Sequence, residues 1–301
     1  MRAIVTGGAG FIGSNLVDAL LARSDEVVIV DNLSSGKREN LNAAATFVEA
    51  DIRDGLDLGS ADVVFHLAAQ ADVQTSVRRP VFDATVNVAG TVEVLEAARK
   101  TGARVVFSST GGAIYGECVE PANESAPLEP MSPYGIAKLC GEQYLLGWNR
   151  IHGMTNSVLR FANVFGPRQD STLEGGVVSI FLERMGRGEP TTIFGDGLQE
   201  RDFVYVDDVV AALLAAADHA PGVFNIGTRN ATSVIDLHHA CAAVAGSEAG
   251  PVIAEARLGD VSRSVLDPAL AQAKLGWRAE TTLEDGLERT WSWMSKEFAQ
   301  A

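Results

Sequence analysis

The first thirteen residues of the chain constrain its fold more than any other stretch. Ile4 and Val5 end an apolar segment typical of a buried strand, the glycine-rich run Thr6–Gly13 follows, and a helical pattern extends from Asn15 to Leu21. A strand, a glycine-rich turn and a helix in this order form a cradle for the diphosphate of a dinucleotide, because the helix N-terminus presents unpaired N–H groups to the anion. The segment therefore predicts a dinucleotide-binding domain.

The four glycines of this run have three expected uses. Gly7 and Gly8 are expected to turn the chain with positive φ, and Gly10 to let the backbone approach a phosphate closely. Gly13 is expected to let the helix pack closely against the strand.

A second buried strand, Glu26–Val30, ends at Asp31. A carboxylate about 20 residues beyond the glycines suits two hydrogen bonds to an adenosine ribose and repels a 2′-phosphate. Asp31 therefore favours NAD over NADP, although Lys37 and Arg38 follow closely and bring positive charge to the same region.

Composition limits the possible partners. The chain has 301 residues, of which 47% are hydrophobic, so it can bury a large core, and its net charge is −15. This negative charge argues against nucleic acid or an anionic membrane as the main partner. The longest apolar stretch, Val209–Ala217, is too short to span a bilayer.

Cysteine usage points to a reducing compartment. Cys118, Cys140 and Cys241 are odd in number and have no paired spacing, which predicts reduced thiols and a cytoplasmic location. No Cys/His cluster has the spacing of metal ligands, so no metal site is expected. The chain enters a strand directly at its N-terminus, so no signal peptide is expected.

Strands and helices alternate through the first half of the chain. Further strands are expected at Thr46–Glu49, Ala61–Leu67, Arg104–Ser108 and Ser157–Arg160, and long helices at Val81–Lys100 and Pro133–Ile151. This alternation predicts an α/β fold, a doubly wound parallel sheet of the Rossmann type, over residues 1–166. Residues 167–301 are expected to form mainly a smaller mixed α/β substrate lobe, with segments near 203–230 (Val204–Val209 and Val223–Gly227) returning to the first domain.

The segment Tyr134–Lys138 places a phenol and an ammonium at positions i and i+4, so both side chains lie on one helix face. A neighbouring cation stabilises phenolate, so Lys138 is expected to lower the pKa of Tyr134 toward neutrality. A tyrosine tuned in this way can exchange a proton with a sugar hydroxyl. The alternative interpretation is a surface pair, which is common on helices.

The strand that ends near Phe107 continues into Ser108–Gly116, which begins with three hydroxyl residues. Hydroxyl groups at the carboxyl end of a parallel strand face the cofactor crevice. One of these hydroxyl groups, on Ser108, Ser109 or Thr110, is therefore expected to polarise a substrate oxygen and to pass its proton to Tyr134. The alternative interpretation is a polar turn.

With these features together, the chain resembles the extended short-chain dehydrogenase/reductase family of NAD-dependent epimerases and dehydratases, and within it the UDP-glucose 4-epimerases. The resemblance covers nearly the whole length and rests on Thr6–Gly13, Asp31–Leu33, Asp51–Ile52, His66–Ala69, Asn87, Ser108–Gly116, Tyr134–Lys138, Arg160–Arg168, Gly195–Asp208 and Arg257–Asp260. It implies a cytoplasmic homodimer of galactose metabolism that interconverts UDP-glucose and UDP-galactose through a 4-keto intermediate.

The same resemblance implies roles for individual residues. Tyr134 is the acid/base, Lys138 binds the cofactor and tunes Tyr134, and Thr110 with Ser109 supplies the catalytic hydroxyl. NAD is implied to contact Gly7, Gly10, Phe11, Ile12, Asp31, Asn32, Gly36, Asp51, Ile52, Leu67, Ala68, Ala69 and Asn87. The UDP-sugar is implied to contact Asn163, Phe194, Arg201, Arg257 and Asp260. A lysine that many epimerases carry after the His66–Ala69 strand is replaced here by Ala71.

Rival chemistries of the family differ at identifiable positions. The 4,6-dehydratases carry an Asp-Glu pair directly after the strand-end threonine, where this chain has Gly111 and Gly112. UDP-glucuronate 4-epimerases tend to have threonine at the position of Asn163 and a second arginine shortly after the Gly-Pro-Arg-Gln run, where this chain has Asp170. A carboxylate there would repel a uronate, so a neutral sugar is favoured.

Two further alternatives concern substrate size and catalysis itself. Ser264 stands where some epimerases place a bulky tyrosine, so a small residue there is expected to admit N-acetylated sugars. A non-catalytic NAD-binding regulator would have no need of Tyr134, Lys138 and Thr110 together.

Overall fold

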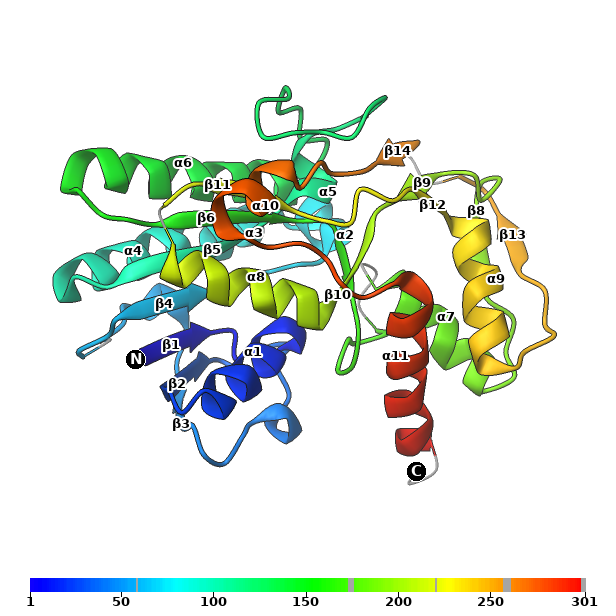
Figure 1. The fold of residues 1–301 in the computed structure, drawn as a ribbon, viewed down its shortest axis with the longest axis horizontal. Helices are drawn as coiled ribbons and strands as arrows, with labels where there is room; N and C mark the ends of the chain where they lie inside the picture. The colour runs from blue at the N-terminus through cyan, green and yellow to red at the C-terminus, as the bar shows by residue number, and fades with distance from the viewer. Residues whose placement is uncertain (58, 173–175, 220, 257–260, 299–301) are drawn as a thin grey trace.

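The computed structural model describes residues 1–57, 59–172, 176–219, 221–256 and 261–298. Its centre is a seven-stranded parallel sheet, which confirms the predicted Rossmann-type α/β fold (Figure 1). In spatial order the strands are β11 (Val223–Ile226), β6 (Ser157–Phe161), β5 (Arg104–Thr110), β4 (Val63–His66), β1 (Arg2–Thr6), β2 (Glu26–Asp31) and β3 (Thr46–Glu49).

The strand order reverses between β1 and β4, which lie side by side at the centre of the sheet. The chain runs outward from β1 through β2 to β3, and from β4 through β5 to β6. Ligands of such sheets bind outside the carboxyl ends of the strands at this reversal point. The residues that follow β1 and β4, Gly7 and Leu67, therefore mark the expected crevice.

Helices cover both faces of the sheet (Figure 1). One face carries α1 (Phe11–Ala22), α8 (Val206–Asp218) and α10 (Ala269–Leu275), and the other carries α4 (Gly90–Thr101) and α6 (Pro133–His152). Alternate residues of β5 enter the two cores, since Val106 packs with the first set and Phe107 with the second. This two-sided burial explains why the strands are continuous apolar runs rather than alternating ones.

The long helix expected at Val81–Lys100 is one helical run with a local irregularity. It consists of α3 (Pro80–Ala84), a π-helical turn η3 (Thr85–Ala89) and α4, and it ends at Gly102, whose φ is +78°. The short helix α2 (Val73–Arg78) precedes it. Turns of this π type occur frequently at functional sites.

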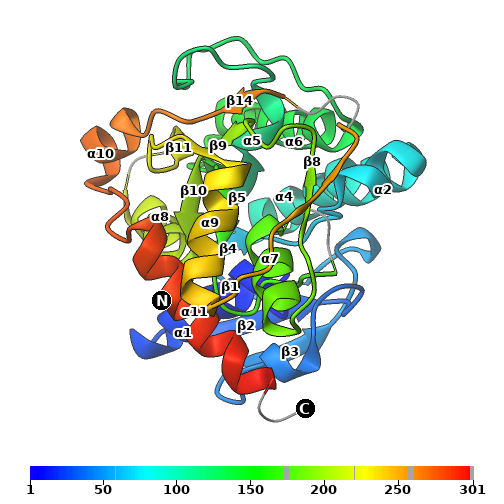
Figure 2. The ribbon, with the colours of Figure 1, turned by 90° about the vertical axis from the view of Figure 1, so that its right-hand side faces the viewer.

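A second lobe packs beside the sheet, and Figure 2 looks at it from its outer side. It contains α7 (Val177–Gly186), α9 (Val234–Ala245) and α11 (Leu283–Phe298), which share one apolar core. The short strands form three small sheets. In the first two, β7 (Asn163–Phe165) pairs with β10 (Phe203–Tyr205), and β8 (Thr192–Phe194) pairs with β13 (Val252–Ala254). In the third, β9 (Glu200–Arg201) lies between β12 (Thr232–Ser233) and β14 (Arg263–Ser264). The remaining turns are η1 (Arg38–Asn40), η2 (Ile52–Asp54) and α5 (Gly111–Ile114).

The segment Val204–Val209 is not a strand of the main sheet. Val204 and Tyr205 belong to β10, which pairs with β7, and the rest begins α8, which packs against α1. By contrast, Val223–Ile226 forms β11 at the edge of the main sheet. No helix within the described ranges is long and apolar enough to cross a membrane.

The glycine-rich turn uses its glycines in two different ways. Gly7 has φ +74°, as predicted, but Gly8 does not have positive φ, so that prediction is wrong. Gly8 is instead required by packing, because a β-carbon there would lie 2.9 Å from a methyl carbon of Ile29. A β-carbon at Gly13 would lie 2.1 Å from the carbonyl oxygen of Gly7. The first turn of α1 can therefore pack this closely against the glycine-rich turn only because residue 13 is glycine.

Candidate active site

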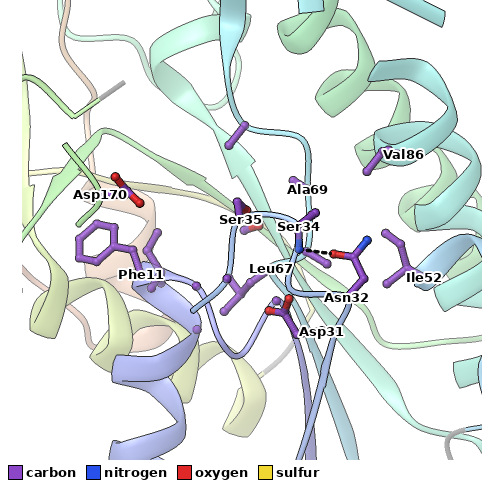
Figure 3. Close-up of a pocket in the computed structure, with 18 of the residues that line it drawn as sticks. Phe11, Asp31, Asn32, Ser34, Ser35, Ile52, Leu67, Ala69, Val86 and Asp170 are labelled. Carbon is purple, nitrogen blue, oxygen red and sulfur yellow. Dashed lines mark hydrogen bonds between the residues drawn. The ribbon is translucent and has the colours of Figure 1, made fainter. Parts of the chain in front are cut away.

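A cavity of about 310 Å³ opens at the carboxyl ends of the central strands (Figure 3). Most residues predicted to hold the cofactor line it: Gly7, Gly10, Phe11, Ile12, Asp31, Asn32, Gly36, Asp51, Ile52, Leu67, Ala68 and Ala69. Ser109, Tyr134 and Lys138 line the same cavity, as does Ala71. The structure therefore brings the glycine turn and the Tyr134–Lys138 pair to one site.

The end of the cavity at β2 is built around Asp31. Its two carboxylate oxygens accept hydrogen bonds from the backbone N–H groups of Ala9, at 3.0 Å, and Leu33, at 2.8 Å. A β-carbon at Gly36 would lie 2.9 Å from both oxygens, so only glycine leaves this side of the carboxylate open. The arrangement leaves lone pairs for a ribose diol, which fits the adenosine end of NAD.

Asp51 completes the wall beside Asn32, whose amide donates to it at 2.8 Å. The Arg53 guanidinium hydrogen-bonds both oxygens of Asp51 and holds the pKa of that carboxyl well below its usual range. Ile52, which is buried, lies in the same wall (Figure 3). This corner is polar at its rim and apolar inside, as a purine ring requires.

A chain of hydrogen bonds beneath the cavity fixes His66 in its neutral form. The Thr91 hydroxyl donates to the carbonyl of Asn87 at 2.7 Å, so it accepts from Nε2 of His66 at 3.0 Å. Nδ1 of His66 then accepts from the Thr6 hydroxyl at 2.8 Å, and Thr6 accepts from the N–H of Ala68 at 3.3 Å. Burial, with a smaller contribution from Lys138, lowers the pKa of His66 to about 3, in agreement with this pattern.

Asn87 does not line the cavity but supports its floor. It is buried in the π-helical turn, where its amide bonds the N–H and the carbonyl of Gln70 at 2.9 and 2.8 Å. It also donates to Asp83 at 2.9 Å. Asn87 therefore holds the segment that follows Ala69 in place.

Tyr134 and Lys138 lie in the first two turns of α6, which begins at a Ser132 cap followed by Pro133. The Lys138 ammonium is buried and donates to the carbonyl of Ser108 at 2.9 Å. It lies 6.0 Å from the Tyr134 ring centroid and 4.9 Å from that of Phe107. The helix and the end of β5 are thus tied together by the lysine.

The prediction that Lys138 lowers the pKa of Tyr134 toward neutrality is wrong. Burial, with a further contribution from the Asp83 carboxylate, raises the pKa of the Tyr134 phenol above its ordinary value. Burial also lowers the pKa of Lys138 to about 8, against the opposing effect of Asp83 and Glu142. Desolvation and the Asp83 charge, rather than Lys138, therefore determine the direction of the phenol pKa.

The two candidate hydroxyl residues have different surroundings. The Ser109 hydroxyl is buried and donates to the Glu142 carboxylate, which also receives three hydrogen bonds from Arg160. The Thr110 hydroxyl forms no hydrogen bond within the described part of the chain and is partly exposed. The arrangement commits Ser109 to a buried network and leaves Thr110 available.

Residues from three segments meet at Gly112. A β-carbon there would lie 3.2 Å from the Asn163 amide oxygen and 4.0 Å from the hydroxyl oxygens of Thr110 and Ser264. At Gly111 a β-carbon would lie 2.5 Å from a methyl group of Leu266, so a side chain there would require Leu266 to move. The positions that carry acidic residues in the dehydratases therefore hold none here.

The other predicted substrate residues lie in the short strands of the second lobe. Phe194 ends β8, and Arg201 ends β9, where its Nη1 donates to the carbonyl of Glu200 at 2.8 Å. Neither residue is among those that line the cavity. Arg257 and Asp260 fall outside the described residues.

Two buried carboxylates at the site escaped the sequence analysis. Asp83 is 1% exposed and one of its oxygens has no hydrogen-bond partner among the described residues, while Glu142 is 0% exposed. Burial raises the pKa of Asp83, against hydrogen bonds from Gln70 and Asn87 and the charge of Lys138. Glu142 stands one helical turn after Lys138, a spacing that could have signalled it.

Asp170 lies in the same cavity as Tyr134 and has a cation beside it. It lines the cofactor cavity, opposite Asn32 and beside Phe11 in Figure 3, and pairs with the Lys37 ammonium at 3.4 Å. The positive charge of Lys37 therefore offsets part of the negative charge of Asp170. Among the residues that the structure describes, no group of three or more His, Cys, Asp or Glu could hold a metal ion.

Comparison with known proteins agrees with this geometry. The sequence model of the NAD dependent epimerase/dehydratase family matches residues 3–227. The chain belongs to that family. The UDP-glucose 4-epimerase of Mycolicibacterium smegmatis is 47% identical over 304 residues, which cover 96% of this chain and 97% of that protein.

Two solved structures extend the likeness to the whole fold. The UDP-glucose 4-epimerase of Thermotoga maritima with UDP-glucose has a TM-score of 0.97 and 49% identity, covering 99% of this chain and 100% of that one. The UDP-glucose 4-epimerase of Thermus thermophilus in complex with NAD has a TM-score of 0.91 and 41% identity, covering 97% and 98%. The family and the NAD cofactor predicted from the sequence are confirmed, and the cavity fits that cofactor through Asp31 and the glycine cradle.

Proposed function

We propose that this protein is an isomerase, an NAD-dependent 4-epimerase that interconverts UDP-glucose and UDP-galactose. One observation carries the proposal: Tyr134 and Lys138 line the dinucleotide cavity, while acidic side chains are missing at Gly111 and Gly112. Such a site can exchange protons with a sugar hydroxyl, but positions 111 and 112 carry no acidic side chain for elimination of water. The family relationship and the named relatives support the same activity.

In this mechanism the proton of the sugar 4-hydroxyl passes through Thr110 to Tyr134, which has to accept it as a phenolate. Because burial raises the pKa of Tyr134, the positive charge of Lys138 beside the ring would have to stabilise that phenolate. Thr110 suits the relay better than Ser109, whose hydroxyl already donates to Glu142. Lys138, held by the Ser108 carbonyl, keeps positive charge beside the phenol and binds the cofactor. NAD, when bound, supplies a hydride acceptor and donor for C4. Tyr134 returns the proton after the 4-keto sugar has presented its other face.

The remaining predicted contacts keep their proposed roles. Gly7, Gly10, Phe11 and Ile12 would hold the diphosphate of NAD at the N-terminus of α1. The adenosine end would be held by Asp31, Asn32, Gly36, Asp51 and Ile52, and the nicotinamide end by Leu67, Ala68 and Ala69, with Asn87 below. UDP would be held by Asn163, Phe194, Arg201, Arg257 and Asp260, mainly from the lobe of residues 167–301.

The activity is tested by incubating the purified protein with UDP-galactose, UDP-galacturonate or UDP-GlcNAc in separate reactions without added cofactor. We expect conversion of UDP-galactose to UDP-glucose, because bound NAD is regenerated in each cycle. Chromatography of the products identifies each epimer. Conversion of UDP-galacturonate alone would replace this proposal by a uronate 4-epimerase, and no conversion of any substrate would contradict it.

We further propose that the sugar pocket accepts N-acetylated sugars. Ser264 is buried and its hydroxyl lies near the position of a Gly112 β-carbon, so two small residues border the same space. Ser264→Tyr is expected to lower kcat/KM for UDP-GlcNAc roughly tenfold or more and to leave UDP-galactose little changed, because the larger ring fills the space of the acetamido group. An equal loss for both sugars, or no turnover of UDP-GlcNAc by the wild-type protein, would contradict this proposal.

A cytoplasmic homodimer is proposed as the working form. The three cysteines are free, which suits a reducing compartment.

Large apolar side chains are exposed on α2, α3 and α6, among them Val77, Val81, Ile136 and Ile151. Ile136→Glu is expected to convert a dimer into a monomer in light scattering, because a charge would be buried in the interface. Val252→Glu, at an equally exposed site on β13, serves as the control.

A further inference from the structure

Two neighbouring side chains at the wall of the cofactor cavity hold polar atoms without partners. Nη1 of Arg168 and Oε1 of Gln169 are both buried and form no hydrogen bond with the described part of the chain. Both residues line the cavity together with Gly10 and Phe11. A buried donor or acceptor without a hydrogen-bond partner lowers the stability of the folded protein. Such a group therefore indicates a partner from outside the chain, such as a bound ligand.

The backbone and the side chain of Arg168 are both held in place by neighbouring residues. The residue has φ +70°, a conformation that residues other than glycine rarely adopt. The segment before it is fixed to α1, since the Asn15 amide donates to the carbonyl of Pro167 at 3.2 Å. Nη2 of Arg168 is bonded to Asp18 at 2.6 Å, which orients the guanidinium plane and leaves Nη1 for another group. Asp18 lies two turns along α1 from the glycine-rich turn.

The side chain of Gln169 is fixed in the same way. Its amide nitrogen donates to the carbonyl of Val164 at 2.8 Å, so the other amide atom is the oxygen, an acceptor. One cavity wall thus presents a cationic donor next to a neutral acceptor. A diphosphate supplies acceptor oxygens for the first, and the ribose hydroxyls on either side of a dinucleotide diphosphate supply donors for the second.

We propose that Arg168 binds the diphosphate of NAD and that Gln169 accepts a hydrogen bond from an adjoining ribose hydroxyl. This inference rests on the proposed function only for the identity of the dinucleotide. A residue that follows β7 would then bind a cofactor whose cradle lies in the first domain. The Lys37–Asp170 pair joins the loop after β2 to the segment that follows β7. Cofactor retention then depends on a contact that the glycine motif does not contain.

The test compares ligands that differ only in their phosphates. Protein freed of bound nucleotide is titrated calorimetrically with NAD, ADP and adenosine. Arg168→Met is expected to weaken binding of NAD and ADP by roughly tenfold or more, because a charge-assisted hydrogen bond is lost. Adenosine, which has no phosphate, should bind Arg168→Met and the wild-type protein within about twofold. Arg187→Met removes an exposed arginine of the second lobe and should change none of the three affinities.

Two further variants separate binding from folding. Asp18→Asn breaks the outer ion pair of Arg168 but leaves its cation in the cavity, so NAD affinity should be retained. Arg168→Lys should recover part of the ADP affinity that Arg168→Met loses. Equal weakening for adenosine and ADP in Arg168→Met, or unchanged ADP affinity, would overturn the proposal, as would failure of the wild-type protein to bind ADP or NAD. Phosphate-dependent binding by a wild-type protein that converts no UDP-sugar would refute the proposed function and leave this inference standing.

Discussion

Replacement of Tyr134 by phenylalanine is expected to lower kcat for UDP-galactose by about a thousandfold or more, while NAD stays bound. The substitution removes only the phenolic oxygen, so the ring and the packing of α6 are retained. Positioned acid/base groups typically contribute about 10²–10⁴ in rate, and this phenol is the proposed group for both proton transfers. The measurement is steady-state turnover together with the dinucleotide released on denaturation.

Tyr144→Phe provides the matched control for that experiment. Tyr144 belongs to the same helix but is 40% exposed, and its loss should leave kcat within about twofold. Unchanged turnover in Tyr134→Phe would favour a non-catalytic NAD-binding regulator. Loss of both turnover and bound NAD would instead indicate that the phenol holds the cofactor.

The second large effect is expected on stability. Arg160 and Glu142 form an ion pair that is 4% and 0% exposed, with Arg160 also donating to the Tyr115 hydroxyl at 2.7 Å. Burial alone would lower the pKa of Arg160, but the Glu142 hydrogen bonds raise it, so the Arg160 guanidinium stays charged. Arg160→Met or Glu142→Gln should therefore reduce the free energy of unfolding by ~3–5 kcal/mol, because each leaves a polar partner buried and unpaired.

Melting temperatures of the single and double variants check this expectation. The double variant should be less destabilised than the sum of the singles, since no uncompensated charge remains. Arg99→Met, which breaks the half-exposed pair with Glu96, should leave the melting temperature almost unchanged, because solvent screens this pair. Losses of equal size at the buried and the half-exposed pair would show that burial of Glu142 does not govern the stability of this region.

The catalytic surroundings illustrate how burial changes a chemical argument. Their spacing in the sequence predicted that Tyr134 and Lys138 lie on one face of a helix, and both lie in the first two turns of α6. Spacing did not reveal that the Lys138 ammonium bonds the Ser108 carbonyl, nor that Asp83 approaches from α3. The direction of the phenol pKa therefore came out opposite to the expectation, because desolvation depends on every segment that packs around the group.

Local sequence signals were sufficient for the parts of the protein that local geometry determines. The glycine turn, the Asp31 strand end and the helix of Tyr134 follow from backbone sterics and from the periods of strand and helix, which act over a few residues. Tertiary structure alone decided that Glu142 lies buried with Arg160, that Asp170 faces Lys37 and that Arg168 reaches the cofactor cavity. The physical reason is that burial and charge pairing depend on which distant segments come together, and packing of the whole chain determines those contacts.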